Sequence, residues 1–484
     1  MSFPNGFLWG ASTSAYQCEG AALEDGKKAS QQDVINAVSS QLRHIADCSV
    51  ATDHYHHFRE DVAYMKQIGL KSYRFSIAWS RIFPDGTGEP NWKGVRFYHE
   101  LIDELKESGI EPIVTMYHYD LPMALVEKYG GWMDRRVVDD FEAYARFIVN
   151  EYKDKVRYWT TINEQNCIVY WLESKCLIPE ERKTDFQLRY QINHYMNLAH
   201  AKACKIVHEL VPDGKVGSAI GYAPIYPQTS KPDDAIAALN AHELKNSFYL
   251  DVYFKGIYNP IAFRYLQKLG YAPVIEDGDM QIIQEGKSDF LAINYYYSEC
   301  AHACTDDEAG KIFCYPGVNY GGVKGGMDGY ENMPGFYKMC KNTNLETSDW
   351  DWAIDGSGLR YALRDIYSRY NVPLMITENG LGAYDVLTED GKVHDPYRIA
   401  YMQEHIRAIG DAIDDGVEVI SYNCWSAIDI LSTSNGMKKR YGLVYVDRTD
   451  DDVKQCKRYR KDSSYWYEQV IASNGKNLES ALGV

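Results

Sequence analysis

Eight short apolar, β-branched runs recur along this 484-residue chain, and a longer segment separates each run from the next. They cover residues 7–12, 71–77, 110–117, 156–163, 215–221, 289–296, 373–379 and 417–425. Such alternation of strand-like and helix-like segments is typical of a parallel sheet with crossover helices. Eight strands without an interruption favour a closed barrel over an open sheet. The sequence therefore predicts an α/β fold, a single (β/α)₈ TIM barrel with long loops at the carboxyl ends of its strands.

The segments between the runs carry apolar residues at helical spacing. Phe58, Val62, Met65 and Ile68 recur every three or four positions and form one apolar stripe. No repeat and no linker rich in proline, glycine or serine divides the chain. We therefore expect residues 1–484 to form one catalytic barrel domain.

Composition excludes several classes of protein. Hydrophobic residues make up 45% of the chain and charged residues 25%, which excludes wholesale disorder. No run reaches the ~18 apolar residues that a membrane helix needs, and the first residues do not resemble a secretory signal. The net charge of −17 disfavours nucleic acid and anionic lipid as partners. Eleven cysteines, an odd number, predict reduced thiols and a cytoplasmic location.

Two glutamates stand at the carboxyl ends of predicted strands. Glu164 follows the fourth run, and Glu378 lies at the end of the seventh. Chemistry in a barrel takes place at this end of the strands, so the two carboxylates are expected at one mouth. Hydrolysis of a glycoside needs such a pair, one acid to protonate the leaving oxygen and one carboxylate to attack the anomeric carbon. Taken alone, the pair could also be two surface glutamates.

Other strand ends carry polar or aromatic residues at the same position. They are Arg74, His118, Asn294, Tyr296 and Trp425. Any one of them, such as His118, would more often be a core residue with satisfied hydrogen bonds. Gathered at one rim with two glutamates, they favour a substrate-binding site.

Several ordered motifs resemble family 1 glycoside hydrolases. They are FLWG at 7–10, QCEG at 17–20, YRFSIAWSRI at 73–82, TINE at 161–164 and ITENG at 376–380. The resemblance runs from about Phe3 to Glu468, which is nearly the whole chain. It implies a (β/α)₈ barrel and a retaining β-glycosidase that uses neither a metal nor an organic cofactor.

The resemblance also implies roles for the catalytic residues. Glu164 becomes the general acid/base, which carries a proton in the first step and activates water in the second. Glu378 becomes the nucleophile, which Arg74 and the Tyr296 hydroxyl are expected to keep ionised by charge and hydrogen bonding. Asn163 is expected to hydrogen-bond the 2-hydroxyl of the sugar, a contact that strengthens in the transition state.

Further residues match substrate-binding positions of the family. Gln17 and His118 match positions that hold the other hydroxyls of the sugar, and Asn294 is expected to bind substrate from the sixth strand end. Trp425 matches the aromatic floor beneath the sugar ring. Trp350 resembles the tryptophan that lines the aglycone side.

The segment 431–442 narrows the range of substrates that we expect. Members of the family that act on neutral sugars usually place Glu-Trp where Ser432 and Thr433 stand. Ser432, Lys439 and Tyr441 instead fit the pattern of the 6-phospho-β-glycosidases. A hydroxyl, an ammonium and a phenol can each donate to a phosphate oxygen, whereas a carboxylate would repel it. The alternative is that residues 438–440 form a basic stretch exposed to solvent. That alternative does not explain why Ser432 stands in place of the usual glutamate.

The expected substrate is a small phosphorylated glycoside. Thr433 stands where 6-phospho-β-galactosidases tend to have tryptophan, which favours 6-phospho-β-D-glucosides, either disaccharides or aryl glucosides. The alternatives are a β-glucosidase for non-phosphorylated glucosides, a 6-phospho-β-galactosidase, or a catalytically silent glycoside-binding barrel. Gln32 and Tyr119 depart from the aromatic residues common at these positions of the pocket wall. The oligomeric state is left open, with a homo-oligomer among the alternatives.

Two further features of the sequence have both a functional and a plainer interpretation. The long insertion at 300–347 contains paired glycines at 321–322 and 325–326, which could cradle a phosphate but suit an ordinary surface loop better. The cluster of Cys300, His302, Cys304 and Cys314 could hold zinc, but its spacing is irregular for a structural site and favours idle thiols. No metal site is therefore expected.

Overall fold

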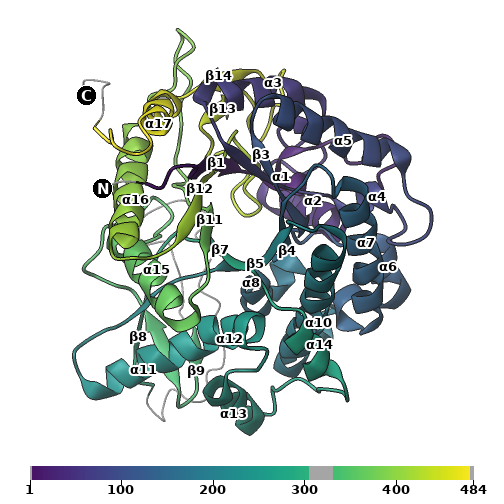
Figure 1. Ribbon diagram of the computed structural model, residues 1–484, viewed down its shortest axis with the longest axis vertical. Helices are drawn as coiled ribbons and strands as arrows, with labels where there is room; N and C mark the ends of the chain where they lie inside the picture. Colours follow the sequence, from purple (N-terminus) through teal and green to yellow (C-terminus); the bar gives the residue numbers. More distant parts are fainter. Residues whose placement is uncertain (1–2, 305–330, 480–484) are drawn as a thin grey trace.

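The computed structural model describes residues 3–304 and 331–479, and eight parallel strands close a barrel at its centre (Figure 1). Around the barrel, the strands follow one another in chain order, and the last pairs with the first. They are β1 (Leu8–Ser12), β2 (Ser72–Ser76), β3 (Glu111–Tyr117), β4 (Tyr158–Asn163), β5 (Lys215–Gly221), β7 (Phe290–Asn294), β11 (Leu374–Glu378) and β12 (Val419–Trp425). Each lies within one of the eight predicted runs, so the predicted barrel is confirmed.

The first and last barrel strands close the ring. β1 pairs in parallel with β12, from Leu8 opposite Ser421 to Ser12 opposite Trp425, and with β2 on its other side. Gly10 allows this double pairing, because a Cβ atom there would lie 2.6 Å from the Ser72 carbonyl oxygen. The ring is therefore complete only when β1, near the beginning of the chain, lies between β2 and β12.

Helices cover the outside of the barrel, as Figure 1 shows. The longer ones are α2 (Gln31–Arg43), α3 (His54–Ile68), α5 (Trp92–Glu107), α7 (Arg136–Tyr152), α10 (Phe186–Leu210), α11 (Pro232–His242), α12 (Phe248–Lys255), α13 (Pro260–Leu269), α15 (Gly356–Tyr370), α16 (Pro396–Asp414) and α17 (Asp462–Ala472). The shorter ones are α1 (Ala15–Cys18), α4 (Trp79–Ile82), α6 (Met123–Tyr129), α8 (Gln165–Tyr170), α9 (Leu172–Lys175) and α14 (Asp279–Glu285), with the 3₁₀ helices η1 (Gly131–Met133) and η2 (Glu180–Arg182) and the π-helix η3 (Glu243–Ser247). None of the helices within 3–304 and 331–479 combines the length and apolar character needed to span a bilayer.

The predicted apolar stripe is the buried face of α3. Phe58, Val62, Met65 and Ile68 are at most 5% exposed and pack in the main core between helices and barrel. The helix ends where Gly69 adopts a φ of 85°, a left-handed conformation that glycine reaches without a steric penalty. This part of the prediction is confirmed.

A second apolar cluster fills the interior of the barrel. Ile113, Ala219, Phe290, Ala292 and Met375 belong to strands that are not all neighbours, so their side chains can meet only inside the ring. A filled interior leaves the strand ends as the place for a cavity.

Three strands from the long segment after β7 and one strand from the segment after β5 build a small additional sheet. This sheet has the order β6-β8-β10-β9, with β6 (Ile225–Pro227), β8 (Glu299–His302), β9 (Asn332–Met333) and β10 (Tyr337–Cys340). A two-stranded ribbon, β13 (Val444–Val446) with β14 (Arg458–Arg460), follows β12. The glycine pairs at 321–322 and 325–326 lie outside the described residues, so the prediction of a surface loop there stays untested.

The cysteine cluster has no metal-binding arrangement in the described part of the chain. Cys300 lies opposite Cys340 across β8 and β10, and His302 shares a hydrogen bond with the Ala303 carbonyl. No group of three or more His, Cys, Asp or Glu side chains within 3–304 and 331–479 is arranged to hold a metal ion. Cys314 lies outside these ranges.

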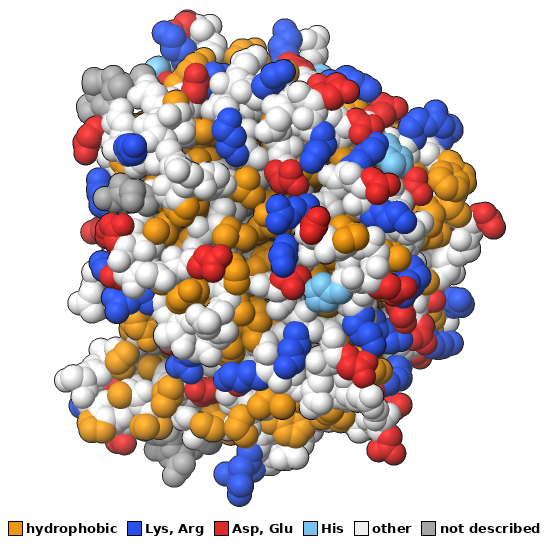
Figure 2. Space-filling view, viewed as in Figure 1, with side chains coloured by type: hydrophobic (Ala, Val, Ile, Leu, Met, Phe, Trp, Pro, Cys, Tyr) orange, Lys and Arg blue, Asp and Glu red, His pale blue; other side chains and the backbone are white. Residues whose placement is uncertain are grey.

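Acidic and basic side chains are interspersed on the surface in the view of Figure 2. The net charge of −17 is therefore not gathered into one acidic face in this view.

Candidate active site

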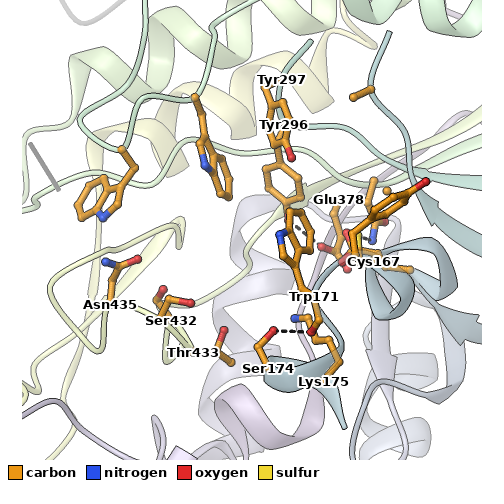
Figure 3. A pocket seen from close by; sticks show the side chains of 18 of the residues that line it. Cys167, Trp171, Ser174, Lys175, Tyr296, Tyr297, Glu378, Ser432, Thr433 and Asn435 are labelled. Carbon is orange, nitrogen blue, oxygen red and sulfur yellow. Dashed lines mark hydrogen bonds between the residues drawn. The ribbon is translucent and has the colours of Figure 1, made fainter. Parts of the chain in front are cut away.

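The strand ends surround a cavity of about 650 Å³. Its lining includes Glu164 after β4, Asn294 at the end of β7, Glu378 at the end of β11 and Trp425 at the end of β12. In Figure 3, Tyr296 and Glu378 lie on one side of this cavity, and Ser432 lies across from them. The two glutamates predicted from the strand ends therefore face one cavity.

Glu378 is buried at the end of β11, and both of its carboxylate oxygens accept hydrogen bonds. Arg74 donates to Oε1 through Nη1, and the Tyr296 hydroxyl donates to Oε2 at 2.6 Å. Burial raises the pKa of Glu378 to about 7, while Arg74 lowers it, nearby Glu164 raises it and Tyr296 lowers it. Arg74 and Tyr296 thus favour the ionised form, as expected, but they only partly offset the cost of burial.

Glu164 is the first residue after β4 and has a left-handed backbone with φ 44°. Its amide donates to the Ala219 carbonyl of β5 at 2.8 Å. The Tyr119 hydroxyl donates to Oε2 at 2.6 Å, and Asn294 Nδ2 donates to Oε1 at 3.1 Å. Both carboxylate oxygens are therefore held by neutral donors, in contrast to the cationic partner of Glu378.

Asn163 links the surroundings of the two carboxylates. Its Oδ1 accepts from Arg74 Nη2 at 2.6 Å and from Asn294 Nδ2 at 3.1 Å. Its Nδ2 lies 3.1 Å from His118 Nε2. Burial holds the pKa of His118 well below its usual range, so the ring is neutral and its Nε2 can accept this bond.

Gln17 and Trp425 form another part of the cavity wall. The Gln17 amide donates to the Leu431 carbonyl at 2.9 Å and accepts from the Ser14 hydroxyl at 2.6 Å. The Trp425 ring lies nearly parallel to that of His118, with centroids 6.2 Å apart and planes inclined by 20°. These contacts fix a flat apolar surface beside polar groups, an arrangement suited to a sugar ring.

Lys439 is buried among aromatic rings. Its Nζ lies 3.8 Å from the ring centroid of Trp352, 4.8 Å from that of Trp350 and 5.5 Å from that of Tyr441. No carboxylate of the described chain pairs with it, and burial lowers its pKa to about 7. A buried ammonium without a counter-ion is a favourable place for a bound anion.

Ser432 and Tyr441 line the same cavity and are 8% and 6% exposed. The basic run at 438–440 is not a solvated stretch, because Lys439 and Arg440 are both 4% exposed. That alternative interpretation is wrong for two of its three residues. The turn between Ser432 and Gly436, joined by backbone hydrogen bonds, brings the serine to the cavity.

Some residues that line the cavity were not assigned from the sequence. Trp352 is nearer to Lys439 than Trp350 is, and the alternating Asp-Trp-Asp-Trp stretch at 349–352 was the available signal. Trp350 also packs on Tyr384 with ring centroids 4.8 Å apart, and its role toward the aglycone stays a prediction. Lys175, at the end of α9, lies in the cavity wall, and no motif indicated it.

A closed (β/α)₈ barrel with two glutamates in one cavity, after its fourth and at its seventh strand, has the architecture of a barrel glycosidase. The chain belongs to glycosyl hydrolase family 1, whose sequence pattern matches residues 1–476. The resemblance noted from the motifs is thereby confirmed.

Similar proteins cover almost the whole chain. Aryl-phospho-beta-D-glucosidase BglC of Bacillus subtilis (strain 168) is 45% identical over 479 residues, 99% of this chain and 98% of that protein. A 6-phospho-beta-glucosidase of Dickeya chrysanthemi is 40% identical over 98% of both chains. Among solved structures, the family 1 β-glucosidase from Thermotoga maritima superimposes with a TM-score of 0.85 at 33% identity, covering 98% of this chain and 99% of that one.

Proposed function

We propose that this chain is a retaining hydrolase of 6-phospho-β-D-glucosides. The observation that carries the proposal is the buried, unpaired ammonium of Lys439 in the cavity that also holds Glu164 and Glu378. The names of the relatives, which include aryl-phospho-beta-D-glucosidase and 6-phospho-beta-glucosidase, support the same substrate class.

In the first step, the Glu378 carboxylate attacks the anomeric carbon while Glu164 protonates the departing oxygen. The attack forms a covalent glycosyl-enzyme ester and releases the aglycone as an alcohol or phenol. Arg74 and Tyr296 hold the attacking carboxylate in one orientation through a bond to each oxygen. Asn163, fixed by Arg74, offers its Nδ2 side to the sugar 2-hydroxyl.

In the second step, Glu164 takes a proton from water, and the resulting hydroxide attacks the anomeric carbon. The ester to Glu378 breaks, and the β-configured sugar phosphate is released. Water replaces the aglycone on the face where Glu164 stands, so one carboxyl group serves as acid and then as base. Neither step calls for a metal ion or an organic cofactor.

Three residues of the segment after β12 bind the phosphate in this proposal, and each has its own role. Lys439 supplies the positive charge, and the Ser432 and Tyr441 hydroxyls supply neutral donors. The binding gain is large because the phosphate provides the counter-ion that buried Lys439 lacks. We also propose a cytoplasmic location, which the free thiols of the described cysteines support.

The test compares matched aryl β-glucosides with and without the 6-phosphate, together with an aryl 6-phospho-β-galactoside. We expect the highest kcat/KM on the 6-phosphoglucoside, and we expect NMR to show the β-anomer as the first product. Ser432→Glu should reduce or invert the preference for phosphate, since a carboxylate repels it and accepts bonds from neutral sugar hydroxyls. Equal activity of the wild-type protein on the phosphorylated and plain glucosides would assign it as an ordinary β-glucosidase. A higher rate on the galactoside would assign it as a 6-phospho-β-galactosidase.

A further inference from the structure

The two residues that meet on one side of the cavity both have an uncommon backbone conformation. Tyr119, just after β3, has φ 71°, and Glu164, just after β4, has φ 44°. Left-handed φ values are uncommon for residues other than glycine, and they persist only where the surroundings hold them. The Tyr119 hydroxyl lies 2.6 Å from Glu164 Oε2, so the two unusual turns bring one donor to one acceptor.

A lysine lies over the ring that provides this hydroxyl. Lys175 Nζ is 4.0 Å from the centroid of the Tyr119 ring, and no carboxylate in the described part of the chain forms an ion pair with it. A cation on the face of an aromatic ring is attracted by the π electrons and withdraws electron density from it. Burial and the nearby Glu164 raise the pKa of Tyr119, and the charge of Lys175 acts against them, so the phenol donates more strongly than it would beneath a neutral side chain.

The first turn of α2 forms hydrogen bonds to the backbone of both Tyr119 and Lys175. The buried Gln31 side chain donates through Nε2 to the Tyr119 carbonyl at 2.8 Å and to the Lys175 carbonyl at 2.9 Å. Gln32 donates to the Ser174 carbonyl at 3.2 Å. Residues distant in the sequence thus form one supporting unit beside Glu164. This unit includes Gln32 and Tyr119, the two pocket-wall positions that depart from the family pattern.

We propose that Tyr119 is a positioning residue for Glu164 and that Lys175, held over the Tyr119 ring, strengthens its hydrogen bond. The proposal rests on the acid/base role of Glu164 given above. The carboxyl group must present an oxygen to the leaving group and then to water without rotating away. Tyr119 on Oε2 and Asn294 on Oε1 restrict that rotation from both sides.

The test removes only the hydroxyl, in Tyr119→Phe, and measures kcat/KM for aryl 6-phospho-β-glucosides with leaving groups of different basicity. A phenyl leaving group needs a proton, whereas 2,4-dinitrophenolate departs without one. We expect a loss of roughly tenfold or more on the phenyl substrate and little loss on the dinitrophenyl substrate, from one hydrogen bond to a charged group. Lys175→Met should give the same graded pattern with a smaller loss.

The matched control is Tyr152→Phe, which also removes one buried phenol hydroxyl. That hydroxyl donates to the Val95 carbonyl in the outer layer, so the variant should keep wild-type values on both substrates. A uniform loss across leaving groups in Tyr119→Phe would mean a structural role and would overturn the proposal. If the loss of kcat/KM in Lys175→Met does not depend on the leaving group, the role assigned to Lys175 is wrong.

A failure of the proposed function gives a different result. In that case Glu164→Ala would lose no more activity on the phenyl substrate than on the dinitrophenyl substrate, and added azide would not restore turnover. If Glu164→Ala behaves as an acid/base variant while Tyr119→Phe does not depend on the leaving group, only the positioning role is wrong.

Discussion

Burial moves the pKa values of two side chains in the cavity toward each other from opposite sides. Glu378, a carboxyl with an ordinary value of 4.5, and Lys439, an ammonium with an ordinary value of 10.5, both have a pKa of about 7. In each case desolvation disfavours the charged form, and Glu378 alone has a partner of opposite charge that offsets part of the penalty. Near neutral pH both groups therefore change charge, with opposite consequences for the reaction.

The first prediction concerns the acidic limb of the pH profile. In the proposed mechanism Glu378 attacks only when ionised, so with a pKa of about 7 its reactive fraction falls about tenfold for each pH unit below 7. We expect kcat/KM on a non-phosphorylated aryl glucoside to decline below pH 7, because this substrate removes the titration of phosphate from the measurement. If kcat/KM instead falls to half near pH 4.5, burial does not raise the pKa of Glu378 to about 7.

The second prediction isolates Lys439 by taking a ratio. We divide kcat/KM for the phosphorylated substrate by kcat/KM for its non-phosphorylated counterpart. The titration of Glu378 affects both values equally and therefore cancels in this ratio. Phosphate is already a dianion above its second pKa of about 6, whereas Lys439 loses its proton above about 7. We expect the ratio to fall by about tenfold or more between pH 7 and 9, as one charge-assisted bond weakens. In Lys439→Met the ratio should be low and independent of pH; a wild-type ratio that stays constant to pH 9 would argue against the lysine.

At the scale of elements, the segment after β12 is held by a buried carboxylate behind the cavity. Asp429 accepts from Arg440 Nη1 at 2.7 Å, from Lys461 Nζ at 2.6 Å and from the Gly442 amide at 3.0 Å. The neighbouring residues Lys439 and Arg440 thus face different surroundings, one the aromatic cavity wall and the other Asp429. This explains how two adjacent basic residues can both be buried.

The third prediction tests this anchor. Asp429→Asn removes the carboxylate that pairs with Arg440 and leaves Lys461 paired with Asp385, and removal of one partner from a buried pair costs about 3–5 kcal/mol. We expect a lower Tm and a reduced preference for phosphorylated substrate, since the same segment carries Lys439. Asp447→Asn is the matched control, because its partner Lys454 is exposed and such pairs contribute about 0–1 kcal/mol. Similar changes in Tm for both variants would mean that Asp429 does not anchor the segment.

The elements themselves were predictable, whereas contacts between distant loops were not. Each strand is an apolar, β-branched run long enough to be recognised alone, and residues at its carboxyl end follow it directly in the sequence. This is why Glu164, Asn294 and Glu378 could be assigned to one rim. The Tyr119–Glu164 bond depends on backbone angles in two loops, and Lys175 reaches the cavity from the short helix α9, which carries no recognisable motif. The pKa of a residue such as Lys439 depends on burial among rings that the sequence does not place in contact.

At the scale of the whole molecule, the barrel is closed through its first strand. Behind β1, Trp9 packs against Phe3, Phe7 and Tyr467, and its indole nitrogen donates to Asn474 at 2.9 Å. The N-terminal strand is thereby tied to α17 near the other end of the chain. Within the described part of the chain, none of the ring and hydrogen-bond partners of Trp9 lines the cavity.

The fourth prediction separates stability from catalysis. Trp9→Ala removes a large side chain that is 2% exposed, and such truncations cost about 3–5 kcal/mol. We expect a lower Tm and a lower denaturant midpoint, with kcat and KM unchanged at temperatures where the variant is folded. A loss of kcat in the folded variant would show that closure of the barrel at β1 also shapes the cavity.

Ser432, Lys439 and Tyr441 lie within one stretch of ten residues, and this has a consequence for the evolution of substrate specificity. Cleavage is assigned to carboxylates after other strands, so a lineage can alter the sugar it accepts by changes in this one stretch while the cleaving apparatus is inherited intact. A gene encoding such a barrel can therefore gain or lose dependence on a phosphorylated nutrient in few mutational steps.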